Sequence, residues 1–208
     1  MKNIEPFEID GVKFDEDHLH FFLYRDMIID LDEVSGLIDH HSIFEELNID
    51  GFWDELKRGC STIIYTEDHN NSKVLGLSLD LPKIDYMSQA DLPGFKVKGV
   101  VDVGQDEAIY VIVYEMKRLF PLFKHKHADL YFECEDLIEV HRDPDQRITK
   151  EDIEYAGVLN EDQANLINGV LDKYYGLAVL DLSSEQFMID EHEDIFCVDP
   201  IISMNIDF

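Results

Sequence analysis

The stretch STIIYTEDHNNSKVLGLSLDL, Ser61 to Leu81, decides the fold because it contains two strand-like runs separated by a polar turn. The runs are rich in isoleucine, valine and leucine, residues that are typical of strands. The turn is rich in asparagine, which tolerates the left-handed backbone angles of hairpin turns. The sequence therefore predicts an antiparallel hairpin here, around which the other elements can be arranged.

The segments before the hairpin predict one strand and two helices. Phe21 to Ile29, FFLYRDMII, is aromatic and branched, which predicts a strand. The following DLDEVSGLIDHHSIFEEL predicts a helix capped by Asp30 or Asp32, because an aspartate side chain accepts hydrogen bonds from the first helical amides. GFWDELKRGC predicts a short amphipathic helix that ends near Gly59, a residue type favoured just after helices.

The middle of the chain leaves alternatives open. Pro82 to Gly104 is rich in proline, glycine and aspartate, which predicts a loop or an excursion. Ile109 to Phe123 is strongly apolar; its length favours a helix, and its IYVIVY start fits a strand equally well. ADLYFECEDLIEV also fits either a strand or an acidic helix.

The last part of the chain predicts alternating helices and strands. We expect a polar connector at HRDPDQRITKED, strands at IEYAGVL and GLAVLDLSS, helices at EDQANLINGVLDKYY and EQFMIDEH, and closing strands at DIFCVDP and IISMNIDF. This order predicts an α/β (α+β) fold with a mixed, mostly antiparallel central sheet and helices on both faces. The length of 208 residues suits a single domain, which can carry an inserted excursion over 82–108.

Charge is the most unusual property of the composition. The chain has 46 acidic and 17 basic residues, a formal net charge of −29 and a pI near 4.3. Such a surface repels nucleic-acid phosphates and anionic lipids, so we expect neither nucleic-acid nor membrane binding. It attracts a small cationic amine or a basic protein, although a merely well-solubilised surface has the same composition.

The cysteines and histidines predict neither a disulfide framework nor a metal site. Cys60, Cys134 and Cys197 are odd in number and far apart, which fits a reducing cytoplasm. The start MKNIEPFEID lacks the apolar core of a signal peptide, and no apolar run approaches the roughly 18 residues of a membrane span. The histidine clusters HLH, HH and HKH match neither an EF-hand loop nor the H-E-x-x-H pattern.

Several short phrases follow one another in an order that is known from one enzyme family. They are IFEELN, then GCSTIIYTEDHNNSKVLGLSL, then VLDLSS directly before EQFMIDEH. This order resembles the GNAT superfamily of acyl-CoA-dependent N-acetyltransferases, in particular its arylalkylamine branch. The resemblance extends from Phe21 to Phe208 and implies an N-acyltransferase that uses acetyl-CoA and acts on a cationic amine.

The resemblance also implies catalytic residues. Glu45 matches the glutamate that is implicated as general base in the family, and Ser183 and Ser184 match a serine pair that positions the acceptor amine. Glu46 stands where the family has proline, so the local bend differs. The alternative interpretation of these residues is structural: solvated glutamates at a helix end and an ordinary serine cap.

The pyrophosphate turn that the resemblance implies falls on Leu159, Gln163 and Asn165. Helix amides and the helix dipole hold phosphates at such turns, and glycine allows a close approach. Here Leu166 and Asn168 stand where the family has glycines, and acidic residues begin the helix. The alternative is an ordinary acidic helix, NEDQANLINGVL, with Asn160 as its cap.

Two functions therefore remain open at the level of the sequence. The first is an acyl-CoA-dependent N-acyltransferase with an altered cofactor turn. The second is a non-enzymatic acidic protein, of the immunity-protein or DNA-mimic kind, that neutralises a basic partner by charge complementarity.

Overall fold

The computed structural model describes residues 4–24, 34, 36–67, 70–122, 126–127, 145, 147–156, 158–182 and 184–204. These residues form two compact units. Unit 1 contains Pro82–Leu92 and Leu119–Met204, and unit 2 contains Ile4–Leu81 and Pro93–Arg118. Within this described part, no helix has the length and apolarity needed to span a bilayer. The prediction of a single domain stays a prediction.

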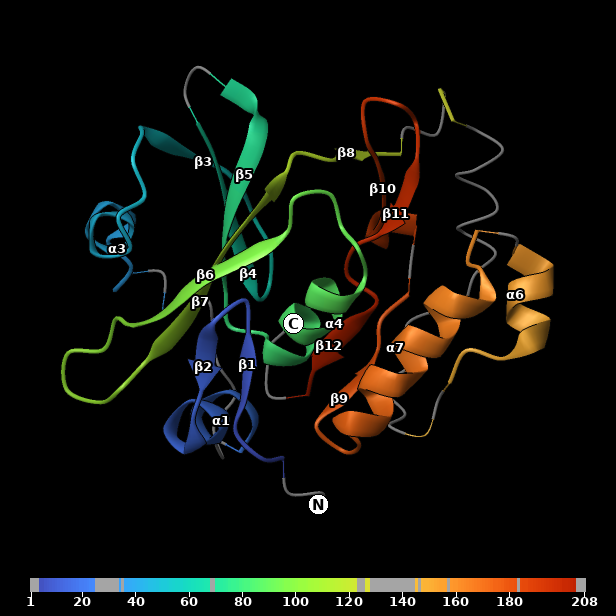
Figure 1. The fold of residues 1–208 in the computed structure, drawn as a ribbon, viewed down its shortest axis with the longest axis horizontal. Helices are drawn as coiled ribbons and strands as arrows, with labels where there is room; N and C mark the ends of the chain where they lie inside the picture. The colour runs from blue at the N-terminus through green and yellow to red at the C-terminus, as the bar shows by residue number, and fades with distance from the viewer. Residues whose placement is uncertain are drawn as a thin grey trace. The chain divides into compact units, whose positions relative to one another are not determined.

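Unit 2 is built on an antiparallel five-stranded sheet (Figure 1). Its order is β3-β4-β5-β7-β6, with the strands β3 (Trp53–Arg58), β4 (Thr62–Glu67), β5 (Asn70–Ser78), β7 (Tyr110–Lys117) and β6 (Lys96–Asp102). The β4–β5 pair is the predicted hairpin, with Thr62 opposite Ser78. Its neighbours extend it on both sides, so this hairpin forms the middle of the sheet.

One glycine in this sheet is required by a close side-chain contact. Gly76 on β5 lies opposite Tyr114 on β7, which is almost completely buried. A Cβ atom built on Gly76 would lie 2.1 Å from the Tyr114 ring, far inside contact distance. The glycine on β5 therefore makes room for the large, buried aromatic side chain of the neighbouring strand β7.

The start of unit 2 adds a small hairpin and two capped helices. The hairpin joins β1 (Phe7–Ile9) and β2 (Val12–Phe14) through Asp10 and Gly11, which both have positive φ. Asp15 caps α1 (Glu16–Leu23), which packs against β7, and Asp39 caps α3 (His40–Glu46). Asp-Gly is a strong hairpin signal that the sequence analysis overlooked.

Unit 1 combines helices with two small antiparallel sheets (Figure 1). Its helices are α4 (Leu81–Gln89), whose first residue belongs to unit 2, α6 (Lys150–Ala156) and α7 (Glu161–Lys173). One sheet has the order β11-β10-β8, with β11 (Ile195–Cys197), β10 (Phe187–Ile189) and β8 (Phe120–Pro121). The other pairs β9 (Ala178–Leu180) with β12 (Ile201–Ser203), so the β10–β11 hairpin lies between two paired strands in the sequence.

The predicted α+β class is confirmed, as are several individual elements. The hairpin at Ser61–Leu81, the helix α7, the buried strand β9 and strands within DIFCVDP and IISMNIDF are all present. The two closing strands do not pair with each other: β11 pairs with β10, and β12 pairs with β9. In the five-stranded sheet every neighbouring pair is antiparallel.

Three predictions before and after the hairpin are wrong. GFWDELKRGC forms the edge strand β3, because its ladder with β4 and the burial of Trp53 outweigh a helical pattern. IEYAGVL begins inside α6, because Thr149 and Asp152 exchange the hydrogen bonds of a helix start. Phe21–Leu23 end the helix α1 instead of starting a strand, because the Asp15 cap begins a helix earlier.

The ambiguous middle of the chain is regular in structure. Pro82–Gly104, predicted as a loop or an excursion, contains α4 and β6 and is therefore not an irregular loop. Pro82 lies in the first helical turn, where its missing N–H is not needed. The apolar run after Ile109 forms the strand β7 and not a helix. In EQFMIDEH a 3-10 turn over Ser184–Gln186 leads directly into strand β10, so the predicted helix there is wrong. ADLYFECEDLIEV, Asp30 and Asp32 lie outside the described residues.

Candidate functional site

The amides at the start of α7 are occupied by the helix's own side chains. The Gln163 N–H donates to Asn160 Oδ1 at 2.9 Å, and the Asn160 N–H donates to Gln163 Oε1 at 3.0 Å. Leu159 is buried just before this capping box, and Asn165 is exposed in the first turns. Glu161 and the residue after it are acidic, and their negative charges interact favourably with the positive end of the helix dipole. This geometry lends the predicted acyl-CoA turn no support, and that turn stays a prediction.

The predicted catalytic residues lie in different units. Glu45 is exposed in the last turn of α3 in unit 2. Ser184 begins the 3-10 turn before β10 in unit 1, and Ser183 lies outside the described residues. Their roles in catalysis therefore stay predictions.

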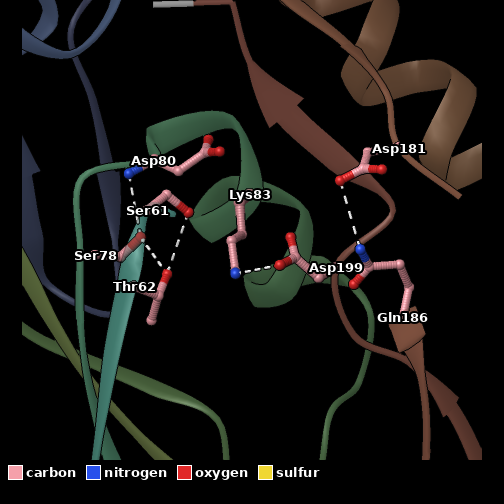
Figure 2. A network of polar contacts seen from close by, with 8 residues as sticks. All are labelled: Ser61, Thr62, Ser78, Asp80, Lys83, Asp181, Gln186 and Asp199. Carbon is pink, nitrogen blue, oxygen red and sulfur yellow. Dashed lines mark hydrogen bonds and ion pairs between the residues drawn. The ribbon is translucent and has the colours of Figure 1, made fainter. Parts of the chain in front are cut away.

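A different group of polar side chains gathers in unit 1 around Asp199, in the link between β11 and β12. Lys83 on α4 forms an ion pair with Asp199 Oδ2 (Figure 2). The Lys83 side chain is 9% exposed and that of Asp199 is 29% exposed, so the carboxylate lies at the edge of the solvent. A lysine this deeply buried requires an anionic partner, because an unpaired buried charge is costly.

Two backbone hydrogen bonds hold Asp199 next to two further polar residues. On one side, the Val198 N–H donates to the Gln186 carbonyl oxygen at 2.8 Å. On the other side, the Asp181 N–H donates to the Pro200 carbonyl oxygen at 2.9 Å. Asp199 is thus fixed between the loop after β9 and the start of β10, and Figure 2 shows the Asp181 and Gln186 side chains facing each other on the same side of Asp199.

The side chains of Asp181 and Gln186 are themselves oriented toward each other. Gln186 Nε2 donates to Asp181 Oδ2 over a long 3.5 Å, so the amide oxygen is the atom that Gln186 can offer to a cation. Both residues are partly exposed. We call Lys83, Asp181, Gln186 and Asp199 the Asp199 cluster.

The helix α4 is attached to the rest of unit 1 by more than the Lys83 ion pair. Asp85, whose side chain is 6% exposed, accepts a hydrogen bond from Lys173 Nζ at 2.6 Å. The Tyr86 hydroxyl donates to the Cys197 carbonyl oxygen at 2.9 Å, and burial raises the pKa of Tyr86, which keeps this donor protonated. These contacts fix the helix that carries Lys83 against β11 and α7.

In unit 2, Figure 2 draws a chain of hydroxyl groups between β4 and β5. The Ser61 and Thr62 hydroxyls are 3.4 Å apart, Thr62 donates to Ser78 at 3.2 Å, and the Asp80 N–H donates to Ser78 Oγ at 3.1 Å. The three hydroxyl residues are buried. Their hydrogen bonds satisfy polar groups where the two strands meet, which is a structural role.

The Asp199 cluster combines two carboxylates, an amide oxygen and an ammonium group. Carboxylate and amide oxygens are the ligands that hard divalent cations prefer, and an ammonium group binds phosphate oxygens. In the described residues, no three histidine, cysteine, aspartate or glutamate side chains form a cation site by themselves. A cation at this cluster must therefore take its other ligands from a bound anion or from water.

These four residues were not predicted from the sequence. The available signal was the phrase DLSSEQ followed, after a hairpin, by an aspartate in VDP. Lys83 had no signal, because only the position of α4 brings it to Asp199. Comparison of the chain with protein-family models, with curated proteins and with solved structures found no match.

Proposed function

We propose that the Asp199 cluster binds the phosphates of a nucleotide together with a divalent cation, in the manner of protein kinases. The observation that carries the proposal is the placement of Asp199 between Asp181 and Gln186 by two backbone hydrogen bonds, opposite the ammonium group of Lys83. In protein kinases an aspartate in H-R-D-L-x-x-x-N faces the substrate hydroxyl, and the asparagine and the D-F-G aspartate hold Mg²⁺.

The order of residues supports this assignment. DLSSEQ has the spacing of D-L-x-x-x-N, with Gln186 in place of asparagine, which keeps an amide oxygen. Asp199 follows the β10–β11 hairpin, in the place of the D-F-G aspartate. Mg²⁺ is typically bound by one or two carboxylates plus substrate phosphates, which is what this cluster can offer.

The sheet of unit 2 is consistent with the same proposal. A five-stranded antiparallel sheet precedes Asp181, Gln186 and Asp199 in the sequence, with the helix α4 between its third and fourth strands along the chain. Protein kinases carry their phosphate-binding lysine on the third strand of this series. Here the lysine of the cluster comes from α4, and Ser78 ends the corresponding strand β5.

Other departures limit the proposal to binding. The turn between β3 and β4 contains Gly59 but lacks the G-x-G-x-x-G pattern that covers the phosphates in kinases. Val179 and Leu180 stand where kinases have His-Arg before the catalytic aspartate. We therefore propose nucleotide binding as the function and leave phosphoryl transfer outside the proposal.

The proposal is tested by thermal unfolding with millimolar ATP and Mg²⁺. A ligand at a hundred times its dissociation constant stabilises the folded state by about 2.7 kcal/mol, which raises the melting temperature by several degrees. Gln186→Ala and Asp199→Asn should remove this shift, and Gln186→Ala leaves the Lys83–Asp199 pair intact. Glu191→Gln, an exposed change in the β10–β11 turn, is the matched control. No shift in the wild-type protein would overturn the proposal.

The same assay tests the acyltransferase prediction. Acetyl-CoA replaces ATP, and Glu45→Gln and Gln163→Ala replace the cluster variants. A shift with acetyl-CoA and none with Mg²⁺-ATP would favour an N-acyltransferase that acts on a cationic amine.

A second candidate function is favoured by the net charge of −29. We propose that this surface attracts a basic protein in the cytoplasm, through steering and charge complementarity. The expected signature is an association rate with a basic protein, such as a lysine-rich histone, that falls steeply between 50 and 500 mM salt. An association rate that is independent of salt would contradict this function.

A further inference from the structure

A pocket of about 360 Å³ lies in unit 2, between the first helix and the loop that joins β6 to β7. Helix α1 contributes Asp17, His20 and Phe21, and the loop with the first residue of β7 contributes Glu107, Ala108 and Tyr110. None of these residues belongs to the Asp199 cluster or to the predicted acyltransferase site. The pocket is therefore independent of the proposed nucleotide site.

The aromatic wall of the pocket is held in place by its neighbours. The Phe21 ring meets the Tyr110 ring edge to face, with centroids 5.5 Å apart. The His18 ring also meets Tyr110 edge to face, at 4.6 Å, and His18 is fixed by its role in the α1 capping box. The Tyr110 ring is thus pre-oriented, which reduces the entropy lost when a ligand binds against it.

The charges around the pocket are mainly negative. Asp17 and Glu107 line it from two different elements. Burial and, to a smaller extent, the charges of Asp102, Asp17 and Asp15 raise the pKa of Tyr110. Asp102 is held in position because its Oδ1 accepts hydrogen bonds from the Gly104 and Ile109 N–H groups, both at 2.9 Å.

Carboxylates beside aromatic rings attract organic cations. An ammonium group gains Coulomb energy from the carboxylates and a cation–π contribution from a ring face, while its alkyl chain packs on the ring. His20 lines the pocket beside these two carboxylates. The volume lies at the lower end of the range for ligand pockets and suits a chain of lysine length.

We propose that this pocket binds an alkylammonium group, supplied either by a lysine side chain of a basic partner or by a free polyamine. Both sources present the same chemistry, an extended alkyl chain that ends in a primary ammonium group. The alkyl chain of the ligand packs against the Phe21 and Tyr110 rings, and its ammonium group pairs with the carboxylates of Asp17 and Glu107.

The test is an NMR titration of the whole chain at pH 8, following the backbone amides of Ala108 and Tyr110. Nα-acetyl-lysine methylamide is titrated against the norleucine analogue, which has a similar chain without the charge. We expect the lysine compound to shift these two amides with at least tenfold higher affinity than the norleucine compound. Equal affinity for the two compounds would overturn the proposal.

A double variant connects the binding to the two carboxylates. Asp17→Asn with Glu107→Gln should weaken lysine-analogue binding about tenfold or more. Asp54→Asn with Glu5→Gln changes the net charge equally at exposed residues that do not line the pocket, and should leave the affinity within twofold. An equal loss in both double variants would mean a general charge effect and would overturn the assigned site.

A third titration, with spermidine, distinguishes the two possible sources of the ammonium group. Spermidine that binds more than tenfold tighter than the lysine analogue identifies a free polyamine, and a smaller difference identifies a lysine side chain. Either result requires the loss in the Asp17–Glu107 double variant, and failure of both ligands to shift Ala108 and Tyr110 overturns the proposal. The Mg²⁺-ATP assay is unaffected by this outcome.

Discussion

The start of α7 and the Asp199 cluster are both polar, and they differ in where their partners come from. At α7, Asn160 and Gln163 satisfy each other across one helical turn. At the cluster, Asp199 is paired with Lys83 from a distant helix and is held by backbone bonds to the loops on both sides. A polar group satisfied by its own neighbours has a structural role, whereas polar groups gathered from distant segments cost free energy to assemble and are typical of sites.

The largest effect is expected when the long-range ion pair between Lys83 and Asp199 is removed. Asp199→Ala leaves the nearly buried Lys83 ammonium without this carboxylate, and we expect it to lower the free energy of unfolding by about 3 kcal/mol. Urea unfolding at pH 7 measures the loss. A variant within about 0.5 kcal/mol of the wild type would show that the ion pair does not stabilise unit 1.

A double-mutant cycle separates the ion pair from simple loss of contacts. Lys83→Met combined with Asp199→Leu replaces both charges by apolar groups and should lose clearly less than the sum of the two single changes. Strict additivity of the two effects would mean that the pair contributes no coupling energy.

A smaller loss of stability is expected when the local cap at the start of α7 is removed. Asn160→Ala removes the acceptor of the Gln163 N–H and should cost about 1 kcal/mol of unfolding free energy. Urea unfolding measures it, with the exposed Asn165→Ala as a control that should stay within about 0.5 kcal/mol of the wild type. If Asn160→Ala costs as much as Asp199→Ala, local capping and long-range assembly do not differ in the way proposed here.

The smallest effect concerns the cap of α3, where the interaction is local and exposed. The Ser42 hydroxyl donates to Asp39 Oδ2 at 2.8 Å, and this bond is the main reason that the pKa of Asp39 is below its ordinary value. A lowered folded-state pKa stabilises the protein above the ordinary pKa, and the stabilisation is lost as the pH falls through the folded-state value. Ser42→Ala should move the pKa of Asp39 upward in a carboxyl NMR titration; an unchanged value would remove the serine as the cause.

The helix α7, whose signals are local, was predicted from the sequence, whereas the strands β3 and β7 depend on their pairing and were not. α7 has its cap, its acidic first turn and its apolar face within one continuous segment, so its start was predicted at Asn160. Trp53–Arg58 has a pattern that fits a helix, and only its ladder with β4 makes it a strand. The apolar run after Ile109 fits a helix and a strand equally well, and it forms a strand because it pairs with β5 on one side and β6 on the other.

The candidate sites follow the same division. The residues selected from the sequence, such as Glu45 and Gln163, lie on helices whose local structure was visible in their own segments. Asp181 has only the short phrase DLSSEQ as a local signal, and Asp199 is one carboxylate in a chain with 46 acidic residues. Their special position arises from the pairing of β9 with β12 and of β10 with β11.

The sequence by itself determined the α+β class, the central hairpin, the capped helix α7 and the strongly acidic character of the protein. These properties depend on residue type and on neighbours a few positions away, which is the range of hairpin turns, helix caps and net charge. The tertiary structure alone decided that Lys83 meets Asp199 and that Tyr110 joins Asp17 and Glu107 around one pocket. Such long-range contacts depend on which strands pair and on where a helix packs. Strand pairing and helix packing are in turn set by the burial of apolar surface over the whole unit.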